Sequence, residues 1–363
     1  MLLIEEIIDE AAKKGASDIH IVSGMKPIIR VKRNLVQSVK DILTEEDVWS
    51  IYDYVVKGDV NKDEFFKKNR RLDSSLVWND IRLRVNVSLA DEKPILTMRI
   101  IPNKLPKFDD LGLPEVIKNM LYQPQGLMLV TGKTNSGKST TLSALISDIN
   151  ENQNKKILTL ENPIEYKHTS QKSFIVQKEV GIGKDCLNFR DGVMNALRED
   201  SDILIIGEIR DKETMEAAID MVESGHLVIG TLHTKSCAET IDRMISFYEV
   251  KEQTQIKNLL SGLLKLVVSQ RLLKSKDDSL VMIPEVMIVD NIIGACIRKD
   301  KFNIAEFEDA IQSGSEKGSV SLTTSLAKAY VEGRLTLDMV KSQVDQRNLE
   351  TLNRTIAQLT KNR

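Results

Sequence analysis

The spacing of hydrophobic residues changes near residue 102, and this change predicts two domains. Before it, apolar residues recur at helical spacing over 2–14, and apolar and polar residues alternate over 81–87. The first pattern predicts an amphipathic helix and the second a half-buried strand, paired with 95–101. Thr44, followed three residues later by Asp47, predicts the start of a second helix. Residues 1–102 are therefore expected to form a small α+β domain.

After this domain the pattern becomes one of short, uninterrupted apolar runs. The segment 103–114 follows Pro102 and contains two further prolines and Gly112, which is typical of a linker. Beyond it, apolar runs alternate with helical patterns, as expected for a parallel sheet covered on both faces. The predicted strands are 126–131, 156–160, 203–207 and 227–231. We expect an α/β core over 115–301 and a helical segment over 302–363.

A glycine-rich loop lies between the first of these strands and the next predicted helix. The run Gly132-Lys133-Thr134-Asn135-Ser136-Gly137-Lys138-Ser139 matches G-x-x-x-x-G-K-[ST] in its strand–loop–helix context. Backbone N–H groups of such a loop surround phosphates. Lys138 is expected to contact the β- and γ-phosphates of ATP, and the Ser139 hydroxyl to bind Mg²⁺. The predicted ATP-binding residues are Gly132, Lys133, Thr134, Asn135, Ser136, Gly137, Lys138, Ser139 and Thr140.

Carboxylates follow two other predicted strands. Glu208 comes directly after the apolar run 203–207, which is the Walker B pattern, and strand carboxyl ends are where open α/β sheets bind ligands. It is expected to hold Mg²⁺ through water or to orient the attacking water. Glu165 and Glu161, after strand 156–160, are candidates to deprotonate that water. The alternative for Glu208 is a solvated residue without a catalytic role.

Two histidines, His226 and His233, bracket the strand 227–231. Seven extended residues span roughly 23 Å, so the two side chains cannot contact one phosphate in the same chain. His233 follows the carboxyl end and is expected to sense or contact the γ-phosphate. His226 is expected to be structural or to lie at an interface. A metal site shared by the pair is disfavoured.

Composition limits the classes of partner. The chain has 363 residues, with 51 Lys+Arg against 53 Asp+Glu, a net charge of −2, and 4% aromatic residues. These values argue against a motor that acts on nucleic acid, which would need a basic channel and stacking aromatics. No apolar run reaches the roughly 18 residues of a membrane span, and the N-terminus lacks a signal peptide, so a cytoplasmic location is expected. The three dispersed cysteines predict neither zinc nor a disulfide.

An ordered set of motifs over almost the whole chain resembles the type II/IV secretion ATPase family. Besides the Gly-rich loop and the two acidic segments, the motifs are Gly15–His20, Arg82–Asn86, Ala196–Asp200, Gly207–Asp211, Gly225–Thr234, Thr240–Arg243, Ser269–Leu273 and Ala310–Gly314. The resemblance implies a PAS-like N-terminal domain joined to a RecA-like P-loop domain. It also implies a homohexameric ring in which ATP lies between the two domains of one subunit.

The resemblance further implies roles for particular residues. Arg84 and Arg99, with Arg82 as a further candidate, would complete the ATP site from the N-terminal domain. Glu165 matches the family's catalytic glutamate, and Glu208 its Walker B glutamate. Further residues in family motifs are His226, Arg198, Arg210 and Arg243.

The implied function is retraction of a type IV pilus, which produces twitching motility. The ATPase would act on an inner-membrane platform protein from the cytoplasmic face of the membrane. A pilus-assembly or type II secretion ATPase is the first alternative, although the chain lacks paired CxxC motifs and a long extra N-terminal domain. A modulatory paralogue is the second.

Several positions depart from the family pattern. Lys133 and Asn135 stand where Pro and Gly are usual, Asn162 replaces an Asp, and Met194 replaces a common Arg. The segment 292–299 occupies the place of the sequence AIRNLIRE in pilus-retraction ATPases, here called the retraction motif, and only Ile297 and Arg298 of that motif are well kept. These departures keep the modulatory alternative open.

Overall fold

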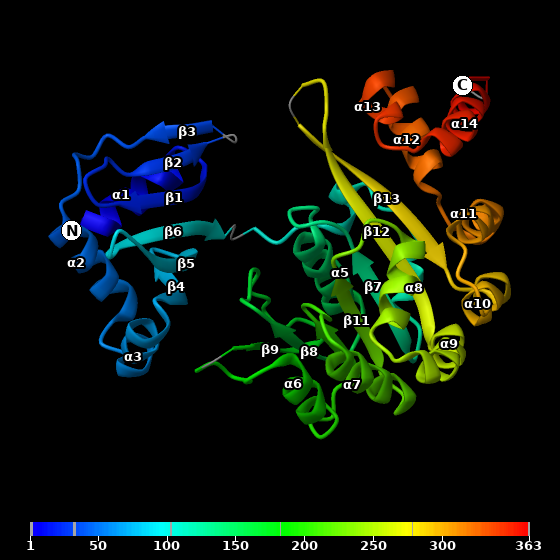
Figure 1. Ribbon diagram of the computed structural model, residues 1–363, viewed down its shortest axis with the longest axis horizontal. Coiled ribbons are helices and arrows are strands. Elements are labelled where there is room, and N and C mark those ends of the chain that lie inside the picture. The colour runs from blue at the N-terminus through cyan, green and yellow to red at the C-terminus, as the bar shows by residue number, and fades with distance from the viewer. Residues whose placement is uncertain (1–2, 32–33, 102–103, 182, 278, 362–363) are drawn as a thin grey trace. The chain divides into compact units, whose positions relative to one another are not determined.

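The computed structural model describes residues 3–31, 34–101, 104–181, 183–277 and 279–361, and Figure 1 shows their helices and strands. The chain divides into two compact units, Met1–Leu105 with Glu165–Lys167, and Pro106–Ile164 with His168–Arg363. Pro102 and residue 103, where the sequence predicts the end of the first domain and the start of the linker, lie outside the described residues. Each unit has its own sheet and its own hydrophobic core.

The N-terminal unit is an α+β fold built on a six-stranded antiparallel sheet of order β3-β2-β1-β6-β5-β4. Apolar residues on alternate strand positions, such as Leu83 and Val85, pack with the helices into one core. The predicted strand pair is confirmed, since β5 pairs with β6. The elements are α1 (Leu3–Lys13), β1 (Ala16–Val22), β2 (Ile28–Val31), β3 (Asn34–Gln37), α2 (Glu45–Val56), α3 (Val60–Asn69), β4 (Arg71–Trp78), β5 (Ile81–Ala90) and β6 (Lys93–Ile101).

The C-terminal unit contains a seven-stranded sheet of order β13-β12-β7-β11-β10-β8-β9. The pairs from β12 to β9 are parallel, and β13 is antiparallel to β12. The strands are β7 (Gly126–Thr131), β8 (Lys156–Glu161), β9 (Phe174–Glu179), β10 (Ile203–Ile206), β11 (Leu227–Leu232), β12 (Leu264–Lys274) and β13 (Leu280–Ile288). The four predicted strands therefore lie next to one another in the order β7-β11-β10-β8, which differs from their order along the chain.

Helices cover both faces of this sheet (Figure 1), as the uninterrupted apolar runs predict. One face packs against η1 (Phe108–Leu111), α4 (Val116–Met120) and α5 (Lys138–Asn152). The other packs against α6 (Phe189–Ala196), α7 (Lys212–Glu223), α8 (Cys237–Ser246), α9 (Val250–Leu263), α10 (Asn291–Arg298) and α11 (Ile304–Ser313).

The remaining helices form a separate cluster against β13. Val281 and Ile283 of β13 pack with buried residues of these helices, among them Leu326 and Leu352. The elements are η2 (Gly314–Lys317), α12 (Leu322–Val331), α13 (Leu337–Lys341), η3 (Gln346–Asn348) and α14 (Leu349–Lys361). In the described part of the chain, no helix combines the length and apolarity that a membrane span requires.

Candidate active site

The glycine-rich loop joins β7 to α5 and takes a shape that its glycines permit. Gly132 and Gly137 have φ angles of 150° and 89°, and Asn135 adopts a left-handed φ of 63°. A Cβ on Gly132 would lie 2.4 Å from Ser136 Oγ and 2.5 Å from the Gln270 carbonyl oxygen. No side chain fits at Gly132, so the loop can close tightly over its own backbone. Asn tolerates the left-handed conformation better than most residues.

The Lys138 ammonium is folded back over this loop. Its Nζ donates to the carbonyl oxygens of Gly132 (2.9 Å) and Lys133 (3.2 Å), and lies 3.3 Å from His233 Nδ1. A phosphate anion would offer the ammonium stronger, charge-assisted partners than these neutral acceptors. A phosphate bound in the loop would therefore draw the ammonium away from these carbonyl oxygens.

His233 links the loop lysine to Glu208. Its Nε2 lies 3.0 Å from Glu208 Oε1, and Arg210 Nε lies 2.5 Å from the same oxygen. Burial, and then the positive charge of Lys138, lower the pKa of His233 below its ordinary value, against the opposing charge of Glu208. A neutral imidazole suits both contacts, because Nε2–H can donate to the carboxylate while Nδ1 accepts from the ammonium.

Close packing of strands brings these side chains together. Parallel β10 and β11 place Glu208 and His233 beyond their carboxyl ends, with Ile206 opposite Gly230. Gly207 donates its N–H to the Leu160 carbonyl at 2.7 Å, and a Cβ there would lie 2.9 Å from the same oxygen. The position before Glu208 must therefore be glycine for β10 to approach β8 this closely.

Glu161 ends the neighbouring strand β8 and is held by two polar side chains. Thr159 Oγ1 donates to Glu161 Oε1 at 2.7 Å, and Gln177 Nε2 donates to the same oxygen at 3.0 Å. Sequence reasoning missed Gln177, because the apolar run of the strand β9 that carries it is only three residues long, Phe174–Val176. Glu165 is partly buried. It belongs to the short segment Glu165–Lys167, which is part of the N-terminal unit although it follows β8 in the chain.

Gln270 of β12 lies in the motif Ser269–Leu273, but the sequence assigned it no role. Its Nε2 donates to the Ser136 carbonyl at 2.9 Å, so this strand holds the middle of the phosphate loop. No strand was predicted between 231 and 302, although 264–274 contains the short apolar run Leu266–Val268. The four predicted strands are parallel as expected, and the structure adds β12 beside β7 and β13 antiparallel to β12 at the edge of the sheet.

Other predicted residues make local contacts away from Lys138. His226, at the amino end of β11, lies 2.9 Å from Ser224 Oγ and 3.0 Å from the Met221 carbonyl. Arg198 is exposed, and the exposed Arg243 guanidinium lies 4.7 Å from the Phe247 ring centroid. These positions place His226 at the opposite end of the strand from His233.

The three predicted arginines of the N-terminal unit share one face of its sheet. Arg84 lies directly opposite Arg99, and Arg82 is two residues further along β5. Arg99 Nε is 3.0 Å from Asp18 Oδ1. Arg82 Nη1 is buried and has no hydrogen-bond partner among the described residues. This face therefore carries donors that an anion could use.

The loop and the end of β10 offer oxygen donors of the kind that Mg²⁺ prefers. Across the described residues no three His, Cys, Asp or Glu side chains cluster as a self-sufficient metal site. Ser139 and Glu208 offer one hydroxyl and one carboxylate, both oxygen donors. Mg²⁺ in nucleotide sites uses one or two such protein groups and completes its shell with phosphate and water. These residues fit that requirement.

A phosphate loop after a buried strand, an acid at the end of β10 and a RecA-like sheet define a P-loop nucleotide hydrolase. Residues 1–296 match the family described as Type II/IV secretion system protein. The chain belongs to this family and is an ATPase.

Two relatives and one solved structure show how far the similarity extends. The type IV pilus retraction ATPase PilT of Pseudomonas aeruginosa is 37% identical over 340 residues, which cover 94% of this chain and 97% of that protein. A twitching motility protein of Neisseria gonorrhoeae is 35% identical over 309 residues, covering 85% of this chain and 81% of that protein. The crystal structure of the pilus retraction motor PilT with bound ADP matches with a TM-score of 0.87 at 33% identity, covering 97% and 100% of the two chains.

Proposed function

We propose that this ATPase is the motor that retracts a type IV pilus and so drives twitching motility. The observation that carries the proposal is the contact chain Lys138–His233–Glu208, found in a protein similar over almost its full length to pilus-retraction ATPases. The contacts support a site that would respond to ATP. The similarity to pilus-retraction ATPases supports the mechanical function. We also propose four parts of the chain: an N-terminal domain over 1–102, a linker over 103–114, an ATPase core over 115–301 and a helical segment over 302–363.

ATP binding would rearrange this chain of contacts. Lys138 would exchange the carbonyls of Gly132 and Lys133 for β- and γ-phosphate oxygens, while the loop N–H groups from Lys133 to Thr140 hold the phosphates. Ser139, and Glu208 through water, would hold Mg²⁺, which neutralises charge on the phosphates when bound. His233, freed from the ammonium, would contact the γ-phosphate only with a proton on Nδ1, which a change of tautomer or protonation would supply.

Water would be activated by a carboxylate at the same edge of the sheet. Glu165 is the first candidate and Glu161 the second, and Thr159 with Gln177 orients Glu161. Arg84 and Arg99, with Arg82 in support, would stabilise phosphate charge from the N-terminal unit. Arg210 competes with His233 for Glu208 and would control how freely that carboxylate moves.

Mechanical work would arise in a ring. We propose a homohexamer on the cytoplasmic face of the inner or cell membrane, acting on the pilus platform protein, with Arg198, Arg243 and His226 at or near subunit contacts. Loss of the γ-phosphate would release His233 and Lys138, so the two units of each chain would open and close with each turnover.

A modulatory ring component is the second candidate. Asn162 is exposed and uncharged where the family has an acid, and the helix α10 retains only Ile297 and Arg298 of the retraction motif. Such a chain would bind ATP but alter the output of another motor.

Replacement of Lys138 by Ala at the native locus tests the proposal, with surface pili counted and twitching tracked. Many pili without twitching support a retraction motor. Few or no pili would assign the chain to assembly or secretion instead. Normal pili and motility would contradict both and favour the modulatory role. Lys301→Ala removes a charge from an exposed site on the same unit and is the matched control.

A further inference from the structure

A cavity of about 300 Å³ lies beside the phosphate loop, on the side of β12. It is lined by the loop side chains from Lys133 to Ser136, by Gln270 to Leu273 of β12, and by Lys235 and Gln343. Lys138 and Ser139, which would hold the phosphates and Mg²⁺ of ATP, are not among the lining residues. The cavity is therefore adjacent to the proposed ATP site and shares its loop.

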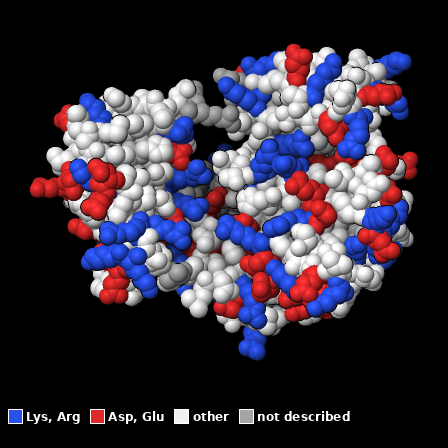
Figure 2. Space-filling view, in the orientation of Figure 1, with Lys and Arg blue, Asp and Glu red and all other residues white. Residues whose placement is uncertain are grey.

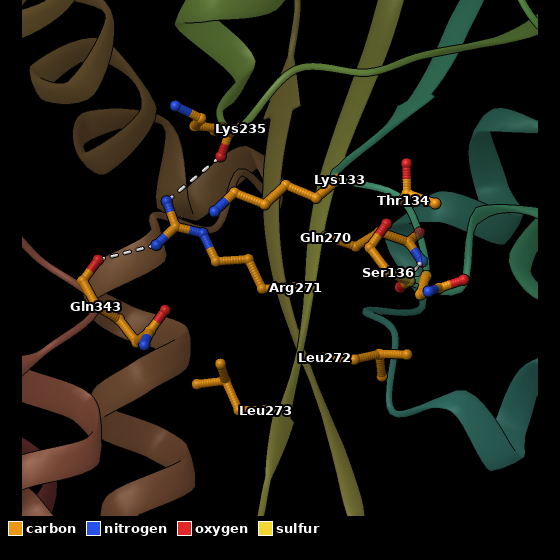
Figure 3. Close-up of a pocket in the computed structure, with 10 residues that line it drawn as sticks. Lys133, Thr134, Ser136, Lys235, Gln270, Arg271, Leu272, Leu273 and Gln343 are labelled. Atoms are coloured by element: carbon orange, nitrogen blue, oxygen red, sulfur yellow. Dashed lines mark hydrogen bonds between the residues drawn. The ribbon is translucent and has the colours of Figure 1, made fainter. Parts of the chain in front are cut away.

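The charged residues that line this cavity are all basic. They are Lys133, Lys235 and Arg271, and among the residues that the structure describes no Asp or Glu lines the cavity. Figure 3 shows the side chains of Lys133 and Arg271 extending toward each other, while Lys235 extends outward from the rim. Figure 2 shows basic side chains gathered on the larger unit in the region where Figure 1 places β12 and β13. Cations placed together in a partly enclosed cavity attract and concentrate anions.

Arg271 is held in a fixed position with donors to spare. Its Nη1 donates to the Gln343 carbonyl at 2.8 Å and its Nη2 to the Lys235 carbonyl at 3.3 Å. A guanidinium has five N–H donors, so these two bonds leave three. Because its side chain is already anchored, a ligand that binds it loses little additional conformational freedom.

The charge of Arg271 is not neutralised by an ion pair within the described residues. Glu239 and Glu285 are the nearby carboxylates, and each accepts a hydrogen bond from a backbone N–H, of Lys235 and Cys237 respectively. Burial lowers the pKa of the Arg271 guanidinium below its ordinary value, more than these two carboxylates raise it. An anion in the cavity would relieve this cost of burying a charge.

We propose that this cavity is a second anion site, which binds a phosphate group on a small molecule while ATP occupies the neighbouring loop. Lys133 and Arg271 would contact the phosphate oxygens, and Lys235 would close over it. The source is either free phosphate, such as the product of hydrolysis, or a nucleoside phosphate. Because Lys133 belongs to the loop, an occupied cavity would influence the loop that holds ATP.

The test titrates inorganic phosphate and, separately, adenosine 5′-monophosphate into the full-length protein by calorimetry. The ATP site is first saturated with a non-hydrolysable ATP analogue and Mg²⁺, and binding of the analogue is measured in every variant. The variants are Lys133→Gln and Lys235→Gln, with Lys301→Gln as the control of equal charge. Arg271 is left intact, because it also holds the backbone at Gln343 and Lys235.

The expected result is one phosphate site per chain that persists with the analogue bound, weakened about threefold to tenfold by Lys133→Gln or Lys235→Gln and unchanged by Lys301→Gln. Tighter binding of the monophosphate identifies a nucleotide ligand, and equal affinities identify free phosphate. Binding seen only without the analogue would place the anion in the ATP site and overturn the proposal. If Lys133→Gln no longer binds the ATP analogue, the test rests on Lys235→Gln alone. A phosphate affinity of Lys235→Gln equal to that of Lys301→Gln would then refute the site.

Discussion

At the scale of single residues, the active site depends on a few atoms that the fold allows to approach closely. His233 illustrates this, because it can link Lys138 to Glu208 only as a neutral ring with one donor and one acceptor. Gly207 is a second example, because the backbone of β8 approaches it so closely that a side chain does not fit. A Cβ at this position would lie 2.9 Å from Leu160 O and 3.3 Å from Glu161 Cα. Both neighbours are backbone atoms, which cannot move aside as a flexible side chain would.

Replacing Gly207 by Ala should therefore push β10 away from β8. We expect the free energy of unfolding to fall by about 1–3 kcal/mol, as in other overpacked sites. We also expect kcat for ATP hydrolysis to fall, because Glu208 is the next residue. Urea unfolding and steady-state ATPase assays measure the two effects. Gly262→Ala in α9 is the control, since nothing lies within 4 Å of its Cβ position and Ala favours helix. Equal behaviour of the two variants would contradict the packing argument.

At the scale of elements, the short segment that follows Glu165–Lys167 is fastened to α5 through buried polar groups. His168 Nε2 lies 3.2 Å from Ser143 Oγ, Asn150 Nδ2 donates to the Thr169 carbonyl at 2.9 Å, and the N–H of Gln171 donates to Asn150 Oδ1 at 2.9 Å. Burial lowers the pKa of His168 from 6.5 to about 4. Helix α5 starts at the phosphate loop, so these contacts tie the loop's helix to the segment beyond β8.

Acid should loosen this attachment. Between pH 6.5 and about 4 the unfolded chain binds a proton at His168 that the folded chain does not, so stability falls as pH falls through this window. The full effect is about 3 kcal/mol, reached near the lower limit. His168→Gln should remove this part of the acid sensitivity, measured by urea unfolding of the C-terminal transition at several pH values. If His168→Gln keeps the full acid sensitivity of the wild type between pH 6.5 and about 4, His168 is not its cause.

At the scale of the whole molecule, two units with separate cores carry complementary chemistry. The larger holds the phosphate loop and the acids, and the smaller holds Arg82, Arg84 and Arg99 on one polar sheet face. Arg99 is already paired with Asp18, so an incoming phosphate would share it with a carboxylate.

If the two units act together in hydrolysis, Arg84→Ala and Arg99→Ala should each lower kcat/KM about tenfold or more without unfolding the chain, because charge-assisted contacts to phosphate would be lost. Arg99→Ala should also lower the unfolding midpoint somewhat, because the buried Asp18 loses its partner. Steady-state kinetics and thermal unfolding measure this. Lys67→Ala, at a lysine on α3 that is 72% exposed and paired with Asp63, is the charge control. Unchanged kinetics in both arginine variants would mean that the N-terminal unit does not complete the site.

Much of this protein follows from local pattern alone. The alternation over 81–87 and the capping pair at Thr44 and Asp47 appear in the structure as β5 and the start of α2. The P-loop motif, which needs only its spacing and flanking elements, lies between β7 and α5. Uninterrupted apolar runs marked the four central strands, since a strand buried on both faces needs no polar alternation.

Other features depend on contacts between residues far apart in sequence, and only the tertiary structure decides them. Strand β12 joins the sheet beside β7, a neighbour more than a hundred residues distant, as at Val267 beside Leu129. For the same reason Gln270, which holds Ser136 from a distance of 134 residues, could not be assigned from the sequence. Gln177 is only 16 residues from Glu161, but a polar residue acquires a role from the atom placed opposite it, and only the pairing of β9 with β8 brings the two together. The sequence by itself determined the chemistry available at the loop, and the fold decided which side chains orient that chemistry.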